Sequence, residues 1–174
     1  SIILPSGGAY TILVEAAAGS SLEQYVTRIV CEDNNGVVLA NEAASEVTIN
    51  IADQGQVICN VVNVRRPVFE VTLNDSLLID ADEATEPGAS PGDTLELEAI
   101  ITKTLGITAN GVLFDVPIDP NTDLVMATAT TSQGTITTGM SPGDTNVIVA
   151  LGDVTDGTPI IIRFQVMVKS PLLP

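Results

Sequence analysis

The residues of this chain that could do chemistry are two cysteines and a group of carboxylates. Cys31 and Cys59 are its only cysteines, and the 174 residues include no histidine. Without an imidazole, the sequence lacks the usual general base, the Ser-His-Asp arrangement and the commonest metal ligand. A tetrahedral zinc site is a poor alternative, because no further Cys or His could complete it. The two cysteines therefore form either one disulfide, for which a single pairing exists, or two buried free thiols.

The second candidate site is the acidic stretch from Asp75 to Glu86, which reads as a loop. Asp80, Asp82 and Glu86 supply hard oxygen ligands of the kind that suit Ca²⁺. Two interpretations stay open: a marginal Ca²⁺ site at these three residues, and a solvated acidic loop without a cation. No other cofactor is indicated, because no Gly-rich phosphate loop runs from a strand into a helix.

Glu96 and Glu98 are paired carboxylates that could in principle perform acid–base work. They lie two residues apart in an alternating run next to a turn, so they read as the solvated face of a strand. No other constellation in the sequence predicts a catalytic centre. We therefore predict that the protein is not an enzyme.

The pattern of turns and alternating residues predicts an all-β fold. The five residues SPGDT at Ser90 to Thr94 recur at Ser141 to Thr145, and alternating apolar and polar residues follow each copy. In both copies Pro presets φ and Gly accepts the positive φ of a type II turn. Asn35-Gly36 predicts a two-residue type I′ hairpin, in which both residues have positive φ. No stretch reads as an amphipathic helix.

Length and patterning predict two tandem β-sandwich domains, residues 1–66 and 67–174, joined near Pro67. Val, Ile and Thr dominate, and Gly and Pro recur between short apolar runs. The strands expected in the first domain are Ala9–Glu15, Tyr25–Glu32, Gly36–Ala40, Glu46–Ile51 and Gln56–Asn63. Each of the two cysteines lies inside one of these strands.

The charge of the chain argues against two classes of partner. The net charge is −16, with six Lys and Arg residues in all. Nucleic-acid binding depends on Lys and Arg that displace counterions, so no nucleic-acid partner is expected. Membrane insertion is not expected either, because the best apolar run, Pro159 to Val168, is short and contains Arg163 and Gln165. The second domain has fifteen acidic and three basic residues, against seven and three in the first.

The second half of the sequence resembles a known family. Its acidic loop, the PGDT turn and strand, the run LFDVPIDPNTDLVMATATTSQGTI, the second SPGDT and the closing IIIRFQVMVK are similar to the conserved repeat domain of bacterial and archaeal cell-surface proteins. The resemblance covers about residues 70–170 and implies an immunoglobulin-like sandwich that serves as a stalk, spacer or adhesin module. The chain departs from the family at Leu97, where an aromatic residue is usual, and at Lys103 to Leu105, where an Asn-rich turn is usual. Ala84 stands where related DxDxDG-like loops have a third ligand.

The first domain resembles a different family over about residues 7–66. Tyr10-Thr11 with Glu15 and Gly19, followed by TRIVCED and VTINIADQGQVICNVVN, is similar to the prealbumin-like repeats of collagen-adhesin B type found in pilins and large adhesins. In that family a glutamate can catalyse a Lys–Asn isopeptide bond, and the matching positions are Glu15 and Asn63. The first domain contains no lysine, so an internal isopeptide bond is not expected here.

These resemblances also bear on the cysteines and on the start of the chain. In a surface protein we expect Cys31 and Cys59 to form a structural disulfide. Prealbumin-like repeats have several strands before the Tyr-Thr strand, so the first domain reads as truncated at its N-terminus. We expect the missing strands to leave Val and Ile of the first sheet exposed, at an edge that could accept a donated strand. Ser1 to Pro5 and Ser170 to Pro174 are the candidate donors.

Together these features predict a non-enzymatic extracellular structural module. It would be a segment of a cell-surface appendage, filament or adhesin stalk that could assemble by strand donation, with identical copies or neighbouring domains of the same surface protein as partners. The alternative is a carbohydrate- or protein-binding module of a secreted adhesin or enzyme. Sugar binding usually needs exposed aromatic platforms. The aromatic residues available are Tyr10, Tyr25, Phe69, Phe114 and Phe164, most of them at strand positions that predict burial.

Overall fold

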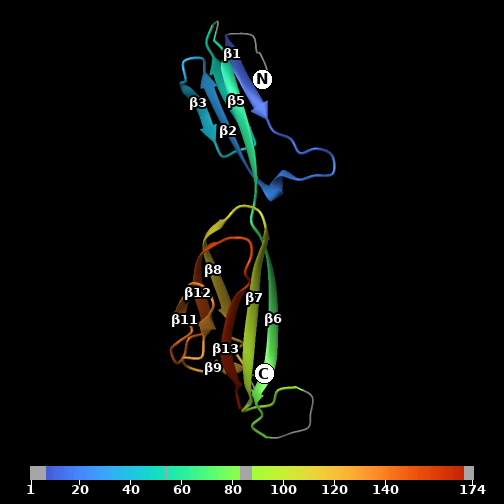
Figure 1. The fold of residues 1–174 in the computed structure, drawn as a ribbon, viewed down its shortest axis with the longest axis vertical. Coiled ribbons are helices and arrows are strands. Elements are labelled where there is room, and N and C mark those ends of the chain that lie inside the picture. The colour runs from blue at the N-terminus through green and yellow to red at the C-terminus, as the bar shows by residue number, and fades with distance from the viewer. Residues whose placement is uncertain (1–6, 54, 83–87, 171–174) are drawn as a thin grey trace. The chain divides into compact units, whose positions relative to one another are not determined.

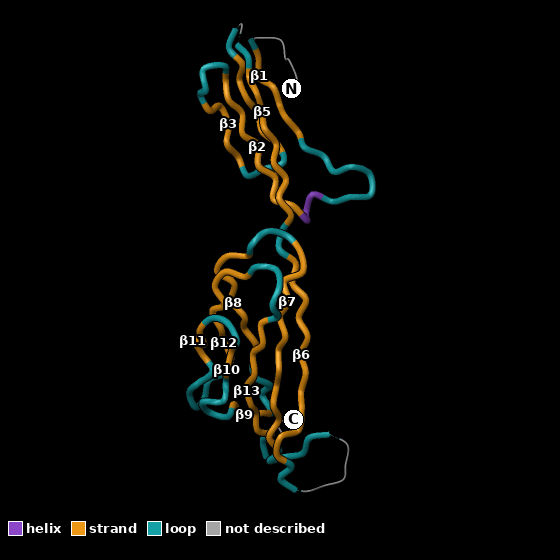
Figure 2. Tube along the Cα trace, in the orientation of Figure 1, coloured by secondary structure: helices purple, strands orange, loops and turns teal. Residues whose placement is uncertain are grey.

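The computed structural model describes residues 7–53, 55–82 and 88–170. The chain forms two compact units, Ser1–Arg66 and Pro67–Pro174, which are described separately (Figure 1). Both consist of antiparallel strands joined by turns and loops (Figure 2). Within the described ranges there is no α-helix, and the one helical turn is the 3-10 helix η1, Leu22–Gln24. The all-β prediction is confirmed.

The described part of the first unit contains five strands in two small sheets. β1 (Gly8–Leu13) pairs with β4 (Glu46–Ile51). In the other sheet, β2 (Tyr25–Asp33) lies between β3 (Val38–Glu42) and β5 (Val57–Arg65). Each strand begins and ends within two residues of one expected from the sequence.

The core of the first unit is small and comes from both sheets. Its buried residues are Ile29, Cys31, Ala40, Val47, Ile49 and Ile51, with Tyr10, Ile12, Val14, Val57 and Cys59 packed against them. The expectation that Val and Ile of the first sheet would be exposed is wrong for β4, where the three apolar side chains are at most 8% exposed. These side chains pack against Ile29, Cys31 and Ala40 of the other sheet, so β4 is covered by the unit itself.

The turn between β2 and β3 differs from the type I′ prediction. Gly36 has a φ of 78°, whereas Asn35 does not have a positive φ. The Asp33 carboxylate accepts hydrogen bonds from the backbone N–H groups of Asn35 and Val37, both at 2.8 Å. The Gly36 N–H donates to the Asp33 carbonyl at 3.0 Å. This side-chain bridge stabilises a turn with a single left-handed residue, which is the local chemistry that aspartate favours in turns.

The second unit is a sandwich of two antiparallel sheets. One has the strand order β10-β13-β7-β6, with β9 also paired to β13, and the other has the order β11-β12-β8. The strands are β6 (Val68–Ile79), β7 (Thr94–Leu105), β8 (Ala109–Pro117), β9 (Thr122–Leu124), β10 (Thr130–Thr131), β11 (Thr135–Thr138), β12 (Asn146–Val154) and β13 (Ile160–Val168).

The acidic loop begins later than the sequence predicts, because β6 extends to Ile79. Asp75 to Ile79 belong to β6 rather than to a loop, because this segment pairs with β7. Asp75 lies opposite Leu97, and Leu77 lies opposite Leu95. The segment begins with two polar residues, Asp75 and Ser76, and runs directly into the acidic residues Asp80 and Asp82. It is the backbone pairing with β7 that makes it a strand.

Both SPGDT turns have the backbone that the sequence predicts. Gly92 and Gly143 have φ values of 99° and 84°. The N–H of Asp93 donates to the Ser90 carbonyl at 3.1 Å, and the N–H of Asp144 donates to the Ser141 carbonyl at 3.3 Å. Positive φ at the Gly position with this hydrogen bond agrees with the predicted type II turn.

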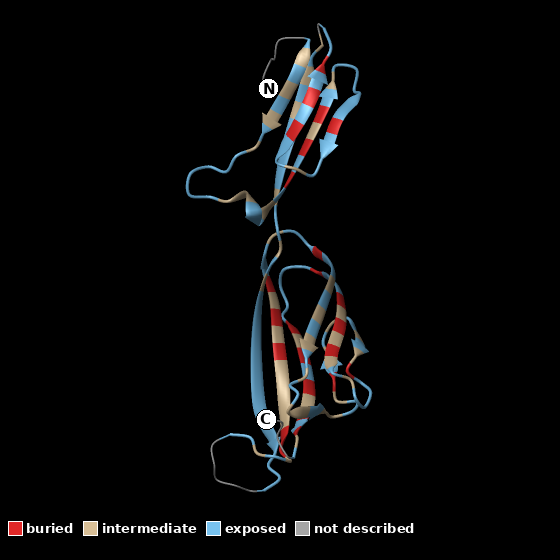
Figure 3. Ribbon diagram, turned by 180° about the vertical axis from the view of Figure 1, so that it is seen from behind, coloured by how far each residue is buried: buried red, intermediate tan, exposed pale blue. Residues whose placement is uncertain are grey.

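The core of the second unit is larger than that of the first. Its buried residues are Ala99, Ile101, Ala129, Val147, Val149, Leu151, Val154, Ile160, Ile162, Phe164 and Val166. β12 and β13 alternate strictly over most of their length, so each of the two sheets presents one apolar face to the other. The outer edge of the larger sheet is different, because β6 is exposed along nearly its whole length (Figure 3).

Candidate functional site

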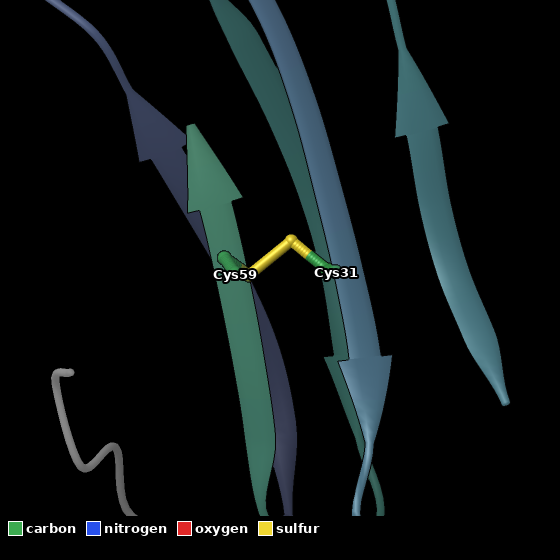
Figure 4. Close-up of a disulfide and its surroundings, with 2 residues drawn as sticks. All are labelled: Cys31 and Cys59. Atoms are coloured by element: carbon green, nitrogen blue, oxygen red, sulfur yellow. A yellow bond between two sulfur atoms is a disulfide. The ribbon is translucent and has the colours of Figure 1, made fainter. Parts of the chain in front are cut away.

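The two cysteines form a disulfide between neighbouring strands of the first unit. Cys31 of β2 and Cys59 of β5 are directly opposite each other in the strand register, and their sulfur atoms are bonded (Figure 4). Cys31 is fully buried in the core, and Cys59 packs against the same cluster. The bond closes a segment with a sequence separation of 28 residues and joins two strands that already pair through their backbones.

The positions that match the isopeptide chemistry of the related repeats are not assembled for it. Glu15 follows the end of β1 and is exposed, and Asn63 is exposed on β5 opposite Thr27. Lysine is absent from residues 1–66. The covalent link in this unit is therefore the disulfide.

The acidic loop of the second unit brings three carboxylates together, although not the three that the sequence predicts. Asp80, Asp82 and Asp93 each place one carboxylate oxygen within 4.8 Å of the other two. Glu86, the third predicted ligand, lies outside the described residues. From the sequence, Asp93 is predicted only as part of the SPGDT turn. It lies thirteen positions after Asp80, and nothing in the local sequence indicates that the two residues come together.

Asp93 organises this loop through hydrogen bonds. It is 2% exposed, and its carboxylate accepts from the backbone N–H of Ala81 at 2.8 Å and of Ser90 at 2.7 Å. The Ser90 hydroxyl lies within hydrogen-bond distance of both Asp93 and Asp82, at 3.1 and 3.0 Å. The Ser90 and Ala81 N–H groups lower the pKa of Asp93 by stabilising its charged form. The loop is thus held closed by an ionised aspartate.

The second SPGDT turn uses its aspartate in the same way but over a shorter distance along the chain. The Asp144 carboxylate accepts from the N–H groups of Gly139 at 2.8 Å, Met140 at 3.1 Å and Ser141 at 3.0 Å. These bonds lower the pKa of Asp144, and the Ser141 N–H has the largest effect. All three donors come from the same turn, whereas Asp93 joins two separate segments.

Lys103 is a buried charged residue whose role the sequence did not reveal. It lies on the core side of β7, and its side chain is 1% exposed. Its Nζ donates to the Gly106 carbonyl at 2.8 Å and to the Asp156 carboxylate. Asp156 itself is 62% exposed. The lysine side chain is therefore buried together with its charge, which is satisfied by the Gly106 carbonyl and by a carboxylate that reaches in from an exposed residue.

The structure places the other candidate groups on solvated or packed faces. Glu98 faces away from the core and accepts a hydrogen bond from Nε of Arg163 at 2.7 Å. None of the five aromatic residues is exposed, and Phe164 is fully buried. Among the described residues, no helix is long and apolar enough to cross a membrane.

Comparison with known proteins identifies the first unit at the level of family. Residues 1–65 match the family described as the prealbumin-like fold domain, which agrees with the resemblance seen in the sequence. No curated protein and no solved structure matches the chain. The match ends within one residue of the boundary of the first unit at Arg66. Residues 1–65 thus carry a prealbumin-like fold domain, a non-catalytic type of module typical of surface and pilin-like proteins.

Proposed function

We propose that this chain is a non-enzymatic structural module of the cell exterior, forming a segment of a surface appendage, filament or adhesin stalk. The observation that carries the proposal is the match of residues 1–65 to the prealbumin-like fold domain. The disulfide in that domain supports an oxidising, extracellular location. The second unit adds a larger sandwich to the same chain, as expected for a tandem stalk.

The partners in this proposal are identical copies or neighbouring domains of the same surface protein. The acidity of the chain, at −16 net, opposes binding to nucleic acid or to anionic lipid. A carbohydrate-binding role is less well supported, because sugar sites usually use exposed aromatic rings and Tyr10, Phe69 and Phe114 pack against the cores.

Immunogold electron microscopy of intact source cells tests the proposal. Antiserum raised against the folded chain should label the cell exterior, and labelled material should form appendages or a surface layer. Antiserum against a cytoplasmic protein is the control and should label only broken cells. Labelling confined to the cytoplasm would contradict the proposal.

A further inference from the structure

β6 forms an open edge of the second unit. Along Val68–Ile79 it pairs with β7 on one side, and within the described residues no strand pairs with its other side. An unpaired edge presents backbone N–H and C=O groups that can template another strand. Natural edge strands often contain Pro or Lys residues that prevent pairing with another chain, and β6 contains neither.

On the side of β6 that faces the sandwich core, the apolar side chains in the middle of the strand are uncovered. Its register places Val71 opposite Ile101 and Leu73 opposite Ala99. Ile101 and Ala99 are 4% and 1% exposed, whereas Val71 and Leu73 are 53% and 66% exposed. Residues that lie opposite each other in an antiparallel pair project to the same face. Phe69, at the start of the strand, packs against the core. The smaller sheet therefore covers the core side of β7 but leaves Val71 and Leu73 of β6 open to solvent.

Asp75 places a negative charge in the middle of this apolar face. It lies opposite Leu97, which packs against the core, and Asp75 itself is exposed. In the described part of the chain no hydrogen bond or ion pair to its carboxylate is found. A charge on the inward face of an edge strand opposes pairing with an arbitrary strand. It also selects a strand that brings a cation to that position.

From this arrangement we propose that β6 is the docking edge for an extended segment of a partner protein, apolar at alternate positions and carrying Lys or Arg opposite Asp75. The segment would add as a strand to the larger sheet and cover Val71 and Leu73. Main-chain hydrogen bonds would supply affinity, and the alternate side chains would supply specificity. This inference rests on the proposed structural role and specifies where in the chain an assembly contact forms.

Charge complementarity favours a basic partner over a second copy of this chain. Three of the six basic residues, Lys103, Arg163 and Lys169, are engaged in ion pairs within their own unit. Pairing of β6 with β6 of another copy would supply no cation to Asp75, because the strand contains no Lys or Arg. It would also bring together two acidic units, each with fifteen acidic and three basic residues.

The probes are two fluorescent synthetic peptides as long as β6, with Val alternating with Thr and the central Val replaced by Lys in one and by Glu in the other. Fluorescence anisotropy measures their affinity for the full chain. We expect the Lys peptide to bind about ten-fold more tightly than the Glu peptide, the change typical of one partly desolvated ion pair. Hydrogen exchange of the β6 amides should slow on binding of the Lys peptide.

A charge-swap variant tests the assignment to Asp75. Asp75→Lys should reverse the preference, so that the Glu peptide binds about ten-fold more tightly. Glu46→Lys makes the same change of charge on an exposed position of β4 in the first unit and should leave the preference unchanged. Leu73→Lys should abolish binding, whereas Leu113→Lys should not, although both leucines are 66% exposed.

Three results would overturn the inference. They are equal affinity for the two peptides, no reversal in Asp75→Lys, and binding without slowed exchange in β6. A concentration-dependent dimer that Leu73→Lys abolishes and Leu113→Lys preserves would assign the edge to a second copy instead. All of these outcomes are independent of surface labelling by immunogold, so failure of the docking edge and failure of the proposed location can be told apart.

Discussion

The two units of this protein keep a β-sandwich folded by different means. Among the residues that the structure describes, the first has a core of six buried residues and a disulfide that joins β2 to β5. The described part of the second has a core of eleven buried residues; this unit has no cysteine, and its two SPGDT turns are held by ionised aspartates. Small domains bury a smaller fraction of their surface, so a covalent link matters more to them. The comparison indicates that packing stabilises the second unit and that cross-linking is decisive in the first.

Removing the disulfide should give the largest difference between the units. We expect Cys31→Ala/Cys59→Ala to destabilise the first unit by about 3–4 kcal/mol, because an open chain of this length gains conformational entropy when it unfolds. Both tyrosines, Tyr10 and Tyr25, lie in the first unit, and the chain has no tryptophan. Tyrosine fluorescence during urea unfolding therefore reports on the first unit alone.

The second unit is the internal control for this experiment. Its unfolding, followed by hydrogen exchange of the β13 amides, should have the same midpoint with and without the disulfide. Equal loss of stability in both units would mean that they unfold together, and the comparison between them would then fail.

Replacing Lys103 should have the next largest effect, confined to the second unit. Lys103→Ala removes a packed stem and leaves a cavity, so we expect a loss on the order of 2 kcal/mol. Lys103→Met keeps most of the volume and should cost less, because Asp156 is 62% exposed and can be solvated when its partner is lost. Calorimetry of the two variants measures both values. A Met variant as unstable as the Ala variant would show that the ion pair, and not the packed stem, is what stabilises this site.

Acid should destabilise the second unit more steeply than the first. The pKa values of Asp93 and Asp144 are lowered by backbone N–H donors. A carboxyl group whose folded pKa is depressed stabilises the fold above its unfolded pKa of about 4. That stability is lost as the pH falls from about 4 through the folded pKa. The first unit has one such aspartate, Asp33, which is held mainly by the Val37 N–H. Thermal unfolding at a series of pH values measures how steeply the thermal midpoint of each unit falls with pH.

Matched variants distinguish the contributions of the two SPGDT turns to the stability of the second unit in the same experiment. Asp93→Asn and Asp144→Asn should each lower the thermal midpoint of the second unit at neutral pH and flatten its dependence on acid. The effect should be larger for Asp93, because its carboxylate links Ala81 to Ser90 across the loop between β6 and β7, while the donors to Asp144 are local. A larger effect for Asp144→Asn would show that the local turn contributes more to stability than closure of the loop does.

Calcium should have the smallest effect, and binding at the acidic loop stays a prediction. Asp80 and Asp82 offer carboxylates near Asp93, but Asp93 already accepts two backbone hydrogen bonds and has fewer lone pairs left for a cation. Millimolar Ca²⁺ should therefore raise the thermal midpoint of the second unit slightly relative to chelator and leave the first unit unchanged. The Asp80→Asn/Asp82→Asn variant should show no shift. A midpoint that is the same in Ca²⁺ and chelator would leave the solvated-loop interpretation.

Patterns that depend on neighbouring residues could be predicted from the sequence. The strands of the first unit follow from alternation and from Gly and Asp punctuation, and both SPGDT turns follow from the positive φ that Gly accepts. The turn at Asn35 could not be predicted in detail, because the Asp33 carboxylate decides its form. The sequence predicts a loop at Asp75 to Ile79, because pairing with a strand about twenty residues away is not visible locally.

By itself the sequence determined the all-β class, the acidity, the absence of histidine chemistry and the single pairing open to its two cysteines. These are properties of composition and short-range periodicity. Only the tertiary structure decided that Asp93 closes the acidic loop, that Lys103 is buried and that Val71 and Leu73 face the core side of a sheet without being covered. Each of these depends on which strand lies beside or opposite which, and strand pairing is set by the packing of segments far apart in the chain.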